Sequence, residues 1–151
     1  MLKNRSGYTL TEMVVVMVIF GVVTGLSMPK LQALISSSAV RSAQTQTGSY
    51  LAQARSLAVQ RGREARFVRN GNTIQVTVDS NGTQVAFARP HDLQREHGVS
   101  LSTTRDSIAF DPRGFAIGTG SMEKVRMSRS GVSDSVCVTK LGKVIYRGCS
   151  I

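Results

Sequence analysis

One carboxylate, Glu12, lies where an apolar run begins, and its position is the clearest chemical signal in the chain. The run starts at Met13 and reaches Met28 without a charged residue. A carboxylate beside hydrocarbon is costly unless a cation neutralises it. We therefore expect Glu12 to pair with a positive group once this segment packs against other molecules.

The apolar run itself has three interpretations. A cleaved secretory signal peptide fits poorly, because no Ala-x-Ala site closes the run. A plain membrane anchor is short, since the 16 residues from Met13 to Met28 give about 24 Å of helix. The third interpretation is a segment that leaves the membrane to pack against copies of itself. Only this third interpretation explains Glu12.

Residues 7–12 read Gly-Tyr-Thr-Leu-Thr-Glu, and with the apolar run they resemble the leader junction of type IV pilins and type II secretion pseudopilins. The resemblance implies that a prepilin peptidase cuts after Gly7 and methylates the new N-terminus at Tyr8. It also implies that Glu12 pairs with the N-terminal amine of a neighbouring pilin or pseudopilin subunit. Pro29 falls where the family commonly has a helix-disrupting proline. Residues 1–7 are then a leader peptide, and residues 8–29 are the transmembrane and assembly helix.

Charge predicts an orientation and a class of partner. Lys3 and Arg5 precede the apolar run, which favours a cytoplasmic N-terminus and a single pass through a bacterial inner membrane. The C-terminal domain would then be periplasmic until the subunit enters a pilus or pseudopilus. The formal net charge is +10, which suits an anionic partner such as nucleic acid, although a basic, well-solvated surface is the alternative.

The later half resembles the FimT and GspH branch of minor pilins and pseudopilins, through residues 108–115, residues 125–130 and the C-terminal hairpin. FimT-like minor pilins bind DNA through a Gly-Arg-x-Arg motif. The matching turn here is Gly142-Lys143-Val144-Ile145, in which Ile145 replaces the second Arg. The excess of Lys and Arg after residue 112, together with this partial match, predicts DNA contacts at Lys140, Lys143, Arg147, Arg126 and Arg129. The alternative is a GspH-like secretion pseudopilin without a nucleic-acid role.

Two cysteines lie symmetrically about Lys143, so a hairpin turning near Gly142 would make Cys137 and Cys149 cross-strand neighbours. Antiparallel neighbours come within about 4.5 Å between Cα atoms, which is within disulfide range. We predict a structural disulfide, because the spacing is not the C-x-x-C of redox-active pairs and the compartment is oxidising.

The remaining polar clusters predict no catalysis. His91, Asp92, Glu96 and His97 fall in a polar stretch and lack the companion ligands of a metal site, so we interpret them as a solvated loop. The chain has no nucleophile elbow and no phosphate-binding loop. We expect no enzyme activity, no metal and no cofactor.

The resemblance implies an α+β fold like that of pilins, in which a long helix packs on a β domain. Leu10 to Arg61 is predicted to be one long helix, apolar at first and amphipathic over residues 30–62, with Gly62 as its stop. Its apolar stripe comprises Leu31, Leu34, Ala43, Thr47, Leu51, Ala54 and Ala58. It should pack on a small antiparallel sheet or sandwich over residues 63–151.

Strand signals divide that β domain into hairpins and loops. Asn70-Gly71 and Asn81-Gly82 are hairpin cues between strands at residues 65–69, 73–78 and 83–88. Residues 89–98 are predicted to be a polar loop, and residues 99–102 and 107–110 a strand pair. Further strands are expected at residues 125–128, 136–141 and 144–149.

Overall fold

The computed structural model describes residues 8–118, 120, 122–146 and 149, and only the backbone of residues 26, 27 and 29. The chain divides into two compact units, residues 1–35 and residues 36–151. One helix, α1 (Leu10–Arg61), contributes to both. Its bounds are those that the sequence predicts.

The first unit is the apolar part of α1. Thr9 precedes the helix, and its hydroxyl oxygen accepts a hydrogen bond from the backbone N–H of Glu12 at 3.3 Å. This contact is the N-terminal cap that Ser and Thr commonly supply. The apolar side chains of residues 13–23 are exposed. The segment is long and apolar enough to cross a membrane.

Position 29 is helical, so α1 is not interrupted at Pro29 in the described chain. The proline lies one position beyond the last large apolar residue of the run, Met28. Proline lacks the N–H that would bond to the preceding turn, so it weakens a helix without always ending it. A local opening of the helix at Pro29 stays a prediction for the assembled filament.

The second unit is built around the C-terminal half of α1. The buried face of this half carries Val40, Ala43, Leu51, Ala54 and Ala58. The predicted stripe was therefore placed too early, because Leu31 and Leu34 are exposed and belong to the first unit. α1 ends at Arg61, and Gly62 takes a left-handed φ of 61° as expected.

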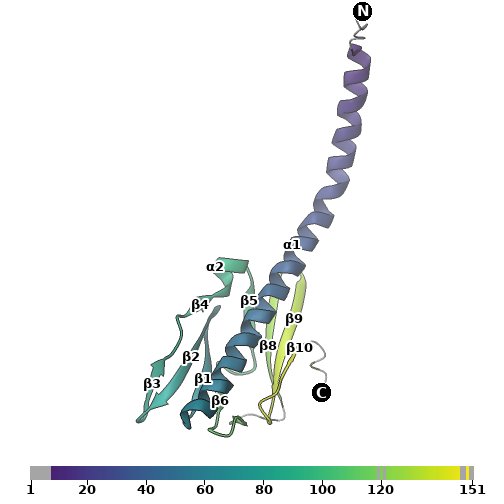
Figure 1. Cartoon of the computed structure of the whole chain (residues 1–151). Helices are drawn as coiled ribbons and strands as arrows, with labels where there is room; N and C mark the ends of the chain where they lie inside the picture. The colour runs from purple at the N-terminus through teal and green to yellow at the C-terminus, as the bar shows by residue number, and fades with distance from the viewer. Residues whose placement is uncertain (1–7, 119, 121, 147–148, 150–151) are drawn as a thin grey trace, which may run out of the picture. The chain divides into compact units, whose positions relative to one another are not determined.

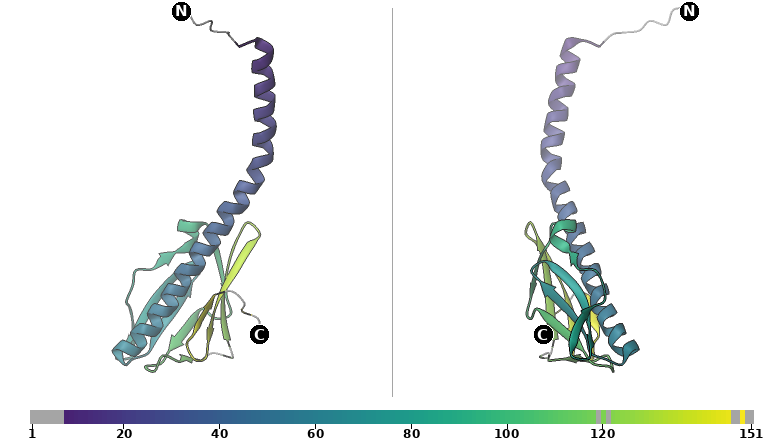
Figure 2. Two further views of the ribbon diagram at one scale, coloured as in Figure 1. Left: turned by 45° about the vertical axis from the view of Figure 1, so that its right-hand side comes forward. Right: turned by 90° about the vertical axis from the view of Figure 1, so that its left-hand side faces the viewer.

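Two antiparallel sheets pack with α1 to form the domain (Figures 1 and 2). The first has the order β3-β2-β1-β6-β7, and β4 also pairs with β2. Its strands are β1 (Ala65–Asn70), β2 (Thr73–Ser80), β3 (Thr83–Ala86), β4 (His91–Asp92), β6 (Ser107–Phe110) and β7 (Ala116–Ile117). The second has the order β10-β9-β8-β5. Its strands are β5 (Ser100–Thr103), β8 (Met122–Arg129), β9 (Val132–Thr139) and β10 (Val144–Tyr146).

The hydrophobic core joins the helix to both sheets. Its largest fully buried side chains include Phe67 and Phe110 of the first sheet, Met127 of the second, and Leu51 of α1. Gln44 on α1 also donates a hydrogen bond to the backbone oxygen of Ser135 in β9 at 3.0 Å. The residues of the core come from both sheets and the helix, so none of the three layers buries its apolar face alone.

Several expectations about the β domain are wrong. The predicted loop at residues 89–98 contains β4 and a short helix, α2 (Leu93–His97). Asp92 caps the start of α2 through hydrogen bonds from Gln94 and Arg95, and Gly98 ends it with a φ of 63°. The buried side chain of Leu93 fixes this segment to the core, which explains why polar composition alone misled the prediction.

The expected pairing between residues 99–102 and 107–110 is also wrong. β5 pairs with β8 in the second sheet, and β6 pairs with β1 in the first. The chain therefore crosses between the sheets at residues 104–106, which adjacency in sequence did not reveal. The hairpin at Asn81-Gly82 is confirmed, because Ser80 pairs with Thr83 across these two residues.

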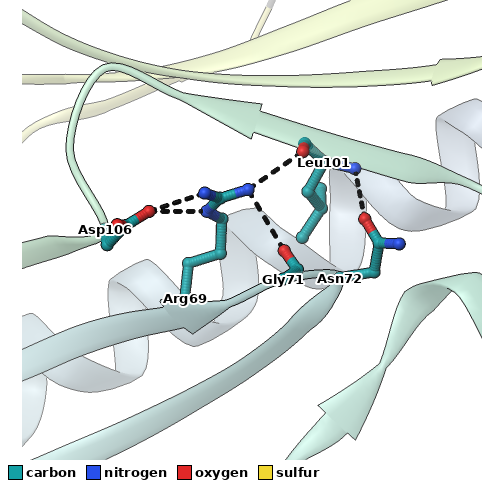
Figure 3. Close-up of polar contacts among 5 residues, drawn as sticks. All are labelled: Arg69, Gly71, Asn72, Leu101 and Asp106. Atoms are coloured by element: carbon teal, nitrogen blue, oxygen red, sulfur yellow. Dashed lines mark hydrogen bonds and ion pairs between the residues drawn. The ribbon is translucent and has the colours of Figure 1, made fainter.

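A polar clamp connects the two sheets beside this crossing (Figure 3). Arg69 on β1 donates to one carboxylate oxygen of Asp106 from Nε and Nη2, at 3.0 and 2.6 Å. Its Nη1 donates to the carbonyl oxygens of Gly71 and Leu101. The side-chain oxygen of Asn72 accepts from the N–H of Leu101 at 2.9 Å. Leu101 is on β5, so the clamp ties the edge of the second sheet to the first.

Candidate assembly segment and nucleic-acid interface

The N-terminal candidate site contains Tyr8 and Glu12, whereas Gly7 lies outside the described residues. Tyr8 is 78% exposed, and Glu12 is exposed in the first turn of α1. Within the described part of the chain, Glu12 has no ion-pair partner. Negative charge in a first turn also interacts favourably with the helix dipole, which gives Glu12 a second, local role.

Thr9 and Glu12 have the spacing of a capping box, a feature that the sequence prediction missed. The motif is Ser or Thr followed three residues later by Glu or Gln. The Thr9 hydroxyl makes its half of the motif with the N–H of Glu12. Any test of Glu12 in assembly must therefore separate its charge from its capping ability.

The disulfide between Cys137 and Cys149 is present, with 5.9 Å between the Cα atoms. The predicted register of the C-terminal hairpin is wrong, however. Cys137 on β9 pairs with Ile145, and β10 ends at Tyr146, before Cys149. The disulfide therefore ties a residue beyond β10 back to the interior of β9, instead of joining two directly opposed strand positions.

The cations predicted to contact DNA do not form one cluster. Arg126 is exposed in the middle of β8, and Arg129 ends that strand, where it donates to the carbonyl oxygen of His97. β9 is an eight-residue strand that spans about 25 Å, and it begins opposite Arg129. Lys140 and Lys143 lie beyond its other end. Arg147 lies outside the described residues. The structure thus separates Lys140 and Lys143 from the two arginines of β8.

Lys140 and Lys143 instead share one end of the domain with Arg55 and Arg113. The N–H of Ala116 donates to the carbonyl oxygen of Lys140 at 3.0 Å, which holds the turn at 111–114 against the turn at 140–143. Arg55 of α1 donates from Nε to the carbonyl oxygen of Gly114 at 3.1 Å. We call Arg55, Arg113, Lys140 and Lys143 the basic turn patch. All four are exposed.

Gly142 makes the contact between these two turns possible. Its φ is 70°, and a Cβ at this position would overlap the carbonyl oxygen of Gly114. The Gly142 N–H donates to the carbonyl oxygen of Thr139 at 2.8 Å, which closes the turn. The glycine of the family-like Gly-Lys pair is therefore required by geometry, and Lys143 is presented directly after it.

The neighbouring turn is organised by Asp111. One of its carboxylate oxygens accepts from the N–H groups of Arg113 and Phe115, at 2.9 and 2.8 Å. Partial desolvation raises the pKa of Asp111, but these two amide donors and the Arg113 guanidinium outweigh it and hold the pKa below its usual value. Asp111 thus stays ionised and offsets part of the positive charge of the patch.

Residues 2–28 match the model of the prokaryotic N-terminal methylation motif, and residues 43–142 match the model of the type II transport protein GspH. The chain belongs to the GspH family. Its GspH region includes most of the amphipathic half of α1 and the strands from β1 to β9. As a member of this family, it is a structural subunit, a minor pilin or pseudopilin of a type IV pilus or type II secretion system, and not an enzyme.

Two crystal structures of the type IV minor pilin FimU from Pseudomonas aeruginosa PAO1 share the fold of this GspH-family chain. Their TM-scores are 0.62 and 0.59, with 18% and 17% sequence identity. Each match covers 72% of this chain, and 88% and 92% of the respective FimU chains. A search of curated proteins gives no significant match. The methylation motif implies processing by a prepilin peptidase and assembly with other pilins.

Proposed function

We propose that this GspH-family subunit is held in the bacterial inner membrane, cut after Gly7, methylated at Tyr8 and assembled into a filament. The observation that carries this proposal is the exposed apolar first part of α1, which leaves its side chains to be covered by lipid or by sister helices. Lys3 and Arg5 favour a cytoplasmic N-terminus and a periplasmic domain. The disulfide agrees with an oxidising compartment.

Glu12 is the assembly charge in this proposal. Cleavage after Gly7 would free the amine of Tyr8, and a neighbouring subunit's Glu12 would neutralise it inside the apolar bundle. Burying either charge alone costs several kcal/mol, so pairing favours one axial register between subunits. The lack of an ion-pair partner for Glu12 among the described residues supports this role.

Two substitutions separate assembly from capping. Glu12→Gln removes the charge but keeps an amide that suits a capping box, whereas Glu12→Ala removes both. We expect both variants to be cleaved and both to be missing from sheared filaments, as measured by immunoblotting of membrane and filament fractions. Thr9→Ala is the matched control, because it removes the cap and keeps the charge, so it should still enter filaments.

The contrary result would be filament entry by the Glu12→Gln variant at the wild-type level. Glu12 would then serve the helix terminus and not the contact between subunits. N-terminal sequencing of the purified native protein checks the processing step, since the mature chain should begin at methylated Tyr8. A native protein that begins at Met1 would refute the whole assembly proposal.

A second proposal is that the filament is a pilus that handles DNA, through the basic turn patch. The gathering of Arg55, Arg113, Lys140 and Lys143 at one end of the domain supports it. Such cations hold phosphates without sequence preference, and each phosphate contact releases counterions. Gly142-Lys143, the partial match to the motif of FimT-like minor pilins, lies at the same end of the domain.

Salt dependence tests this proposal directly. Residues 36–151 contain the buried core and can be titrated with fluorescent duplex DNA at several salt concentrations. We expect the logarithm of the binding constant to fall with the logarithm of salt with a slope of about −2 to −4. The Lys140→Ala/Lys143→Ala double variant should make that slope shallower by about 2.

The matched control is Lys124→Ala/Arg126→Ala, which removes the same charge from exposed positions on β8. An equal loss with both double variants would indicate binding by overall charge and not by the patch. No binding at low salt would leave the alternative, a type II secretion pseudopilin of GspH type without a nucleic-acid role.

A further inference from the structure

The structure brings together the only two histidines of the chain, both near the carboxylate of Glu96. His91 is on β4, and Glu96 and His97 are in the last turn of α2. The ligand atoms of the three side chains all lie within 4.8 Å of one another. We propose that His91, Glu96 and His97 form a binding site for a divalent transition-metal ion, best suited to Zn²⁺.

The backbone that carries the three residues is fixed on both sides of α2. His91 pairs with Ile74 of β2, and the buried Leu93 anchors the first turn. Asp92 caps that turn, and Gly98 closes the helix with hydrogen bonds to Gln94 and Leu93. The three side chains are therefore presented by a short, doubly capped segment and not by a loose loop. Such a segment reduces the ordering cost of binding an ion.

His91 and Glu96 are in close contact without a hydrogen bond between them, and a cation bound by both would account for this contact. Nε2 of His91 lies 2.9 Å from a carboxylate oxygen of Glu96. This nitrogen is buried, yet it makes no hydrogen bond of acceptable geometry. A buried nitrogen whose contact with a carboxylate lacks hydrogen-bond geometry needs an explanation, and an ion held between the two atoms is one. A metal ion can accept one lone pair from the nitrogen and another from the carboxylate oxygen.

His97 is oriented by α1. Its Nε2 lies 3.0 Å from the side-chain oxygen of Gln46. If Nε2–H donates to that oxygen, Nδ1 of His97 keeps its lone pair and is the nitrogen that binds the metal. A histidine that binds a metal through one ring nitrogen commonly donates a hydrogen bond from the other, which fixes the tautomer and the ring orientation.

The donor set selects the class of ion. Two imidazole nitrogens and one carboxylate suit Zn²⁺ and its neighbours in the transition series, whereas Ca²⁺ and Mg²⁺ prefer oxygen ligands alone. Three protein ligands leave at least one coordination position for water. Arg129, which donates to the His97 carbonyl, and the adjacent Arg95 oppose a bound cation, so we expect micromolar and not nanomolar affinity.

The experiment uses the full-length chain in detergent micelles, purified without a histidine tag. Because both histidines of the chain lie in the cluster, imidazole coordination can come only from this site. Isothermal titration with ZnCl₂ should give one equivalent per chain. Co²⁺ should give the visible absorption of a site with nitrogen ligands. Binding should weaken on acidification, since a metal needs the neutral imidazole.

Three variants and a control decide the outcome. His91→Gln and His97→Gln should abolish the titration heat, and Glu96→Gln should weaken binding about tenfold or more. Glu96 is on the outer face of α2 with its side chain 52% exposed, so that variant should fold normally. Glu64→Gln removes the same charge beyond the C-terminal end of α1 and should change nothing. No uptake by the wild type, or unchanged uptake by either histidine variant, would overturn the proposal.

Discussion

Arg69 shows how one side chain connects two sheets. Its side chain is about one-fifth exposed, and its guanidinium bonds to Asp106 and to the carbonyl oxygens of Gly71 and Leu101. No periodicity in the sequence distinguishes it from the surface cations Arg63 and Arg66, because its partners in the other strands and loops, Leu101 and Asp106, lie 32 and 37 residues away. Residue type alone therefore could not reveal its role.

Substitution of Arg69 should destabilise the domain. Arg69→Ala leaves the Leu101 carbonyl without its donor, and hydrogen bonds to charged groups are worth about 1.5–3 kcal/mol. We expect a loss of that size in the free energy of unfolding, measured by urea denaturation. The control is Arg66→Ala, because the Arg66 side chain is 41% exposed and its ion pair with Glu64 should contribute less than about 1 kcal/mol. Equal losses for the two variants would contradict the clamp.

Asp111 should make stability depend on pH. Its pKa in the folded protein lies below the ordinary 3.8, so its ionised form stabilises the fold above that value. This stabilisation is lost as the pH falls through the lowered pKa. We expect the stability difference between wild type and Asp111→Asn to shrink on acidification, as followed by urea denaturation at a series of pH values. A constant difference over that range would show that the carboxylate charge contributes nothing.

At the scale of elements, the sequence predicted what depends on local chemistry. The bounds of α1, the stop at Gly62 and the turn at Asn81-Gly82 follow from caps, periodicity and turn residues. The hairpin between β8 and β9 was missed, although Ser130 and Gly131 join these strands and both have a left-handed φ. Ser-Gly is a recognised turn signal, so that omission was avoidable.

The remaining errors are tertiary. Which sheet β5 and β6 join depends on partners 20 or more residues away, and α2 exists because Leu93 finds a place in the core. The same holds for the candidate sites. Glu12, Lys140 and Lys143 could be selected from motifs, whereas Arg55 joins the basic turn patch only because α1 passes Gly114. The histidine cluster needed the capped geometry of α2.

The C-terminal segment should lose much of its stability on reduction. The disulfide closes a loop with a sequence separation of 12, which contributes about 3 kcal/mol on the chain-entropy model. We expect dithiothreitol to lower the free energy of unfolding by that amount. The Cys137→Ala/Cys149→Ala variant should have the reduced stability and should not respond to dithiothreitol. Full stability after complete reduction would show that packing alone holds the segment.

In the whole molecule, the two units have different roles: the second contains the folded core, and the first carries the segment proposed for assembly. All buried hydrophobic side chains of the described core come from residues 40–138, within the second unit. The first unit contributes exposed apolar surface and Glu12. The domain is therefore complete in its packing without the apolar segment, while filament entry depends on that segment.

Truncation tests this division. Residues 36–151 should unfold in one cooperative transition and keep the near-ultraviolet circular dichroism of a packed core. Residues 62–151 are the matched control, since they lack Val40, Ala43, Leu51 and Ala54 and should not fold cooperatively. A molten state in residues 36–151 would mean that the apolar segment contributes to the domain.

The continuity of α1 also has a mechanical consequence. A pull on a filament would reach the domain along the backbone of one helix, and it would act on the buried contacts of residues 40–58. Those contacts lie along the helix, so a load along the axis of this half of α1 would shear them together instead of opening them one after another. Resistance to such a load is governed by the rate of unfolding.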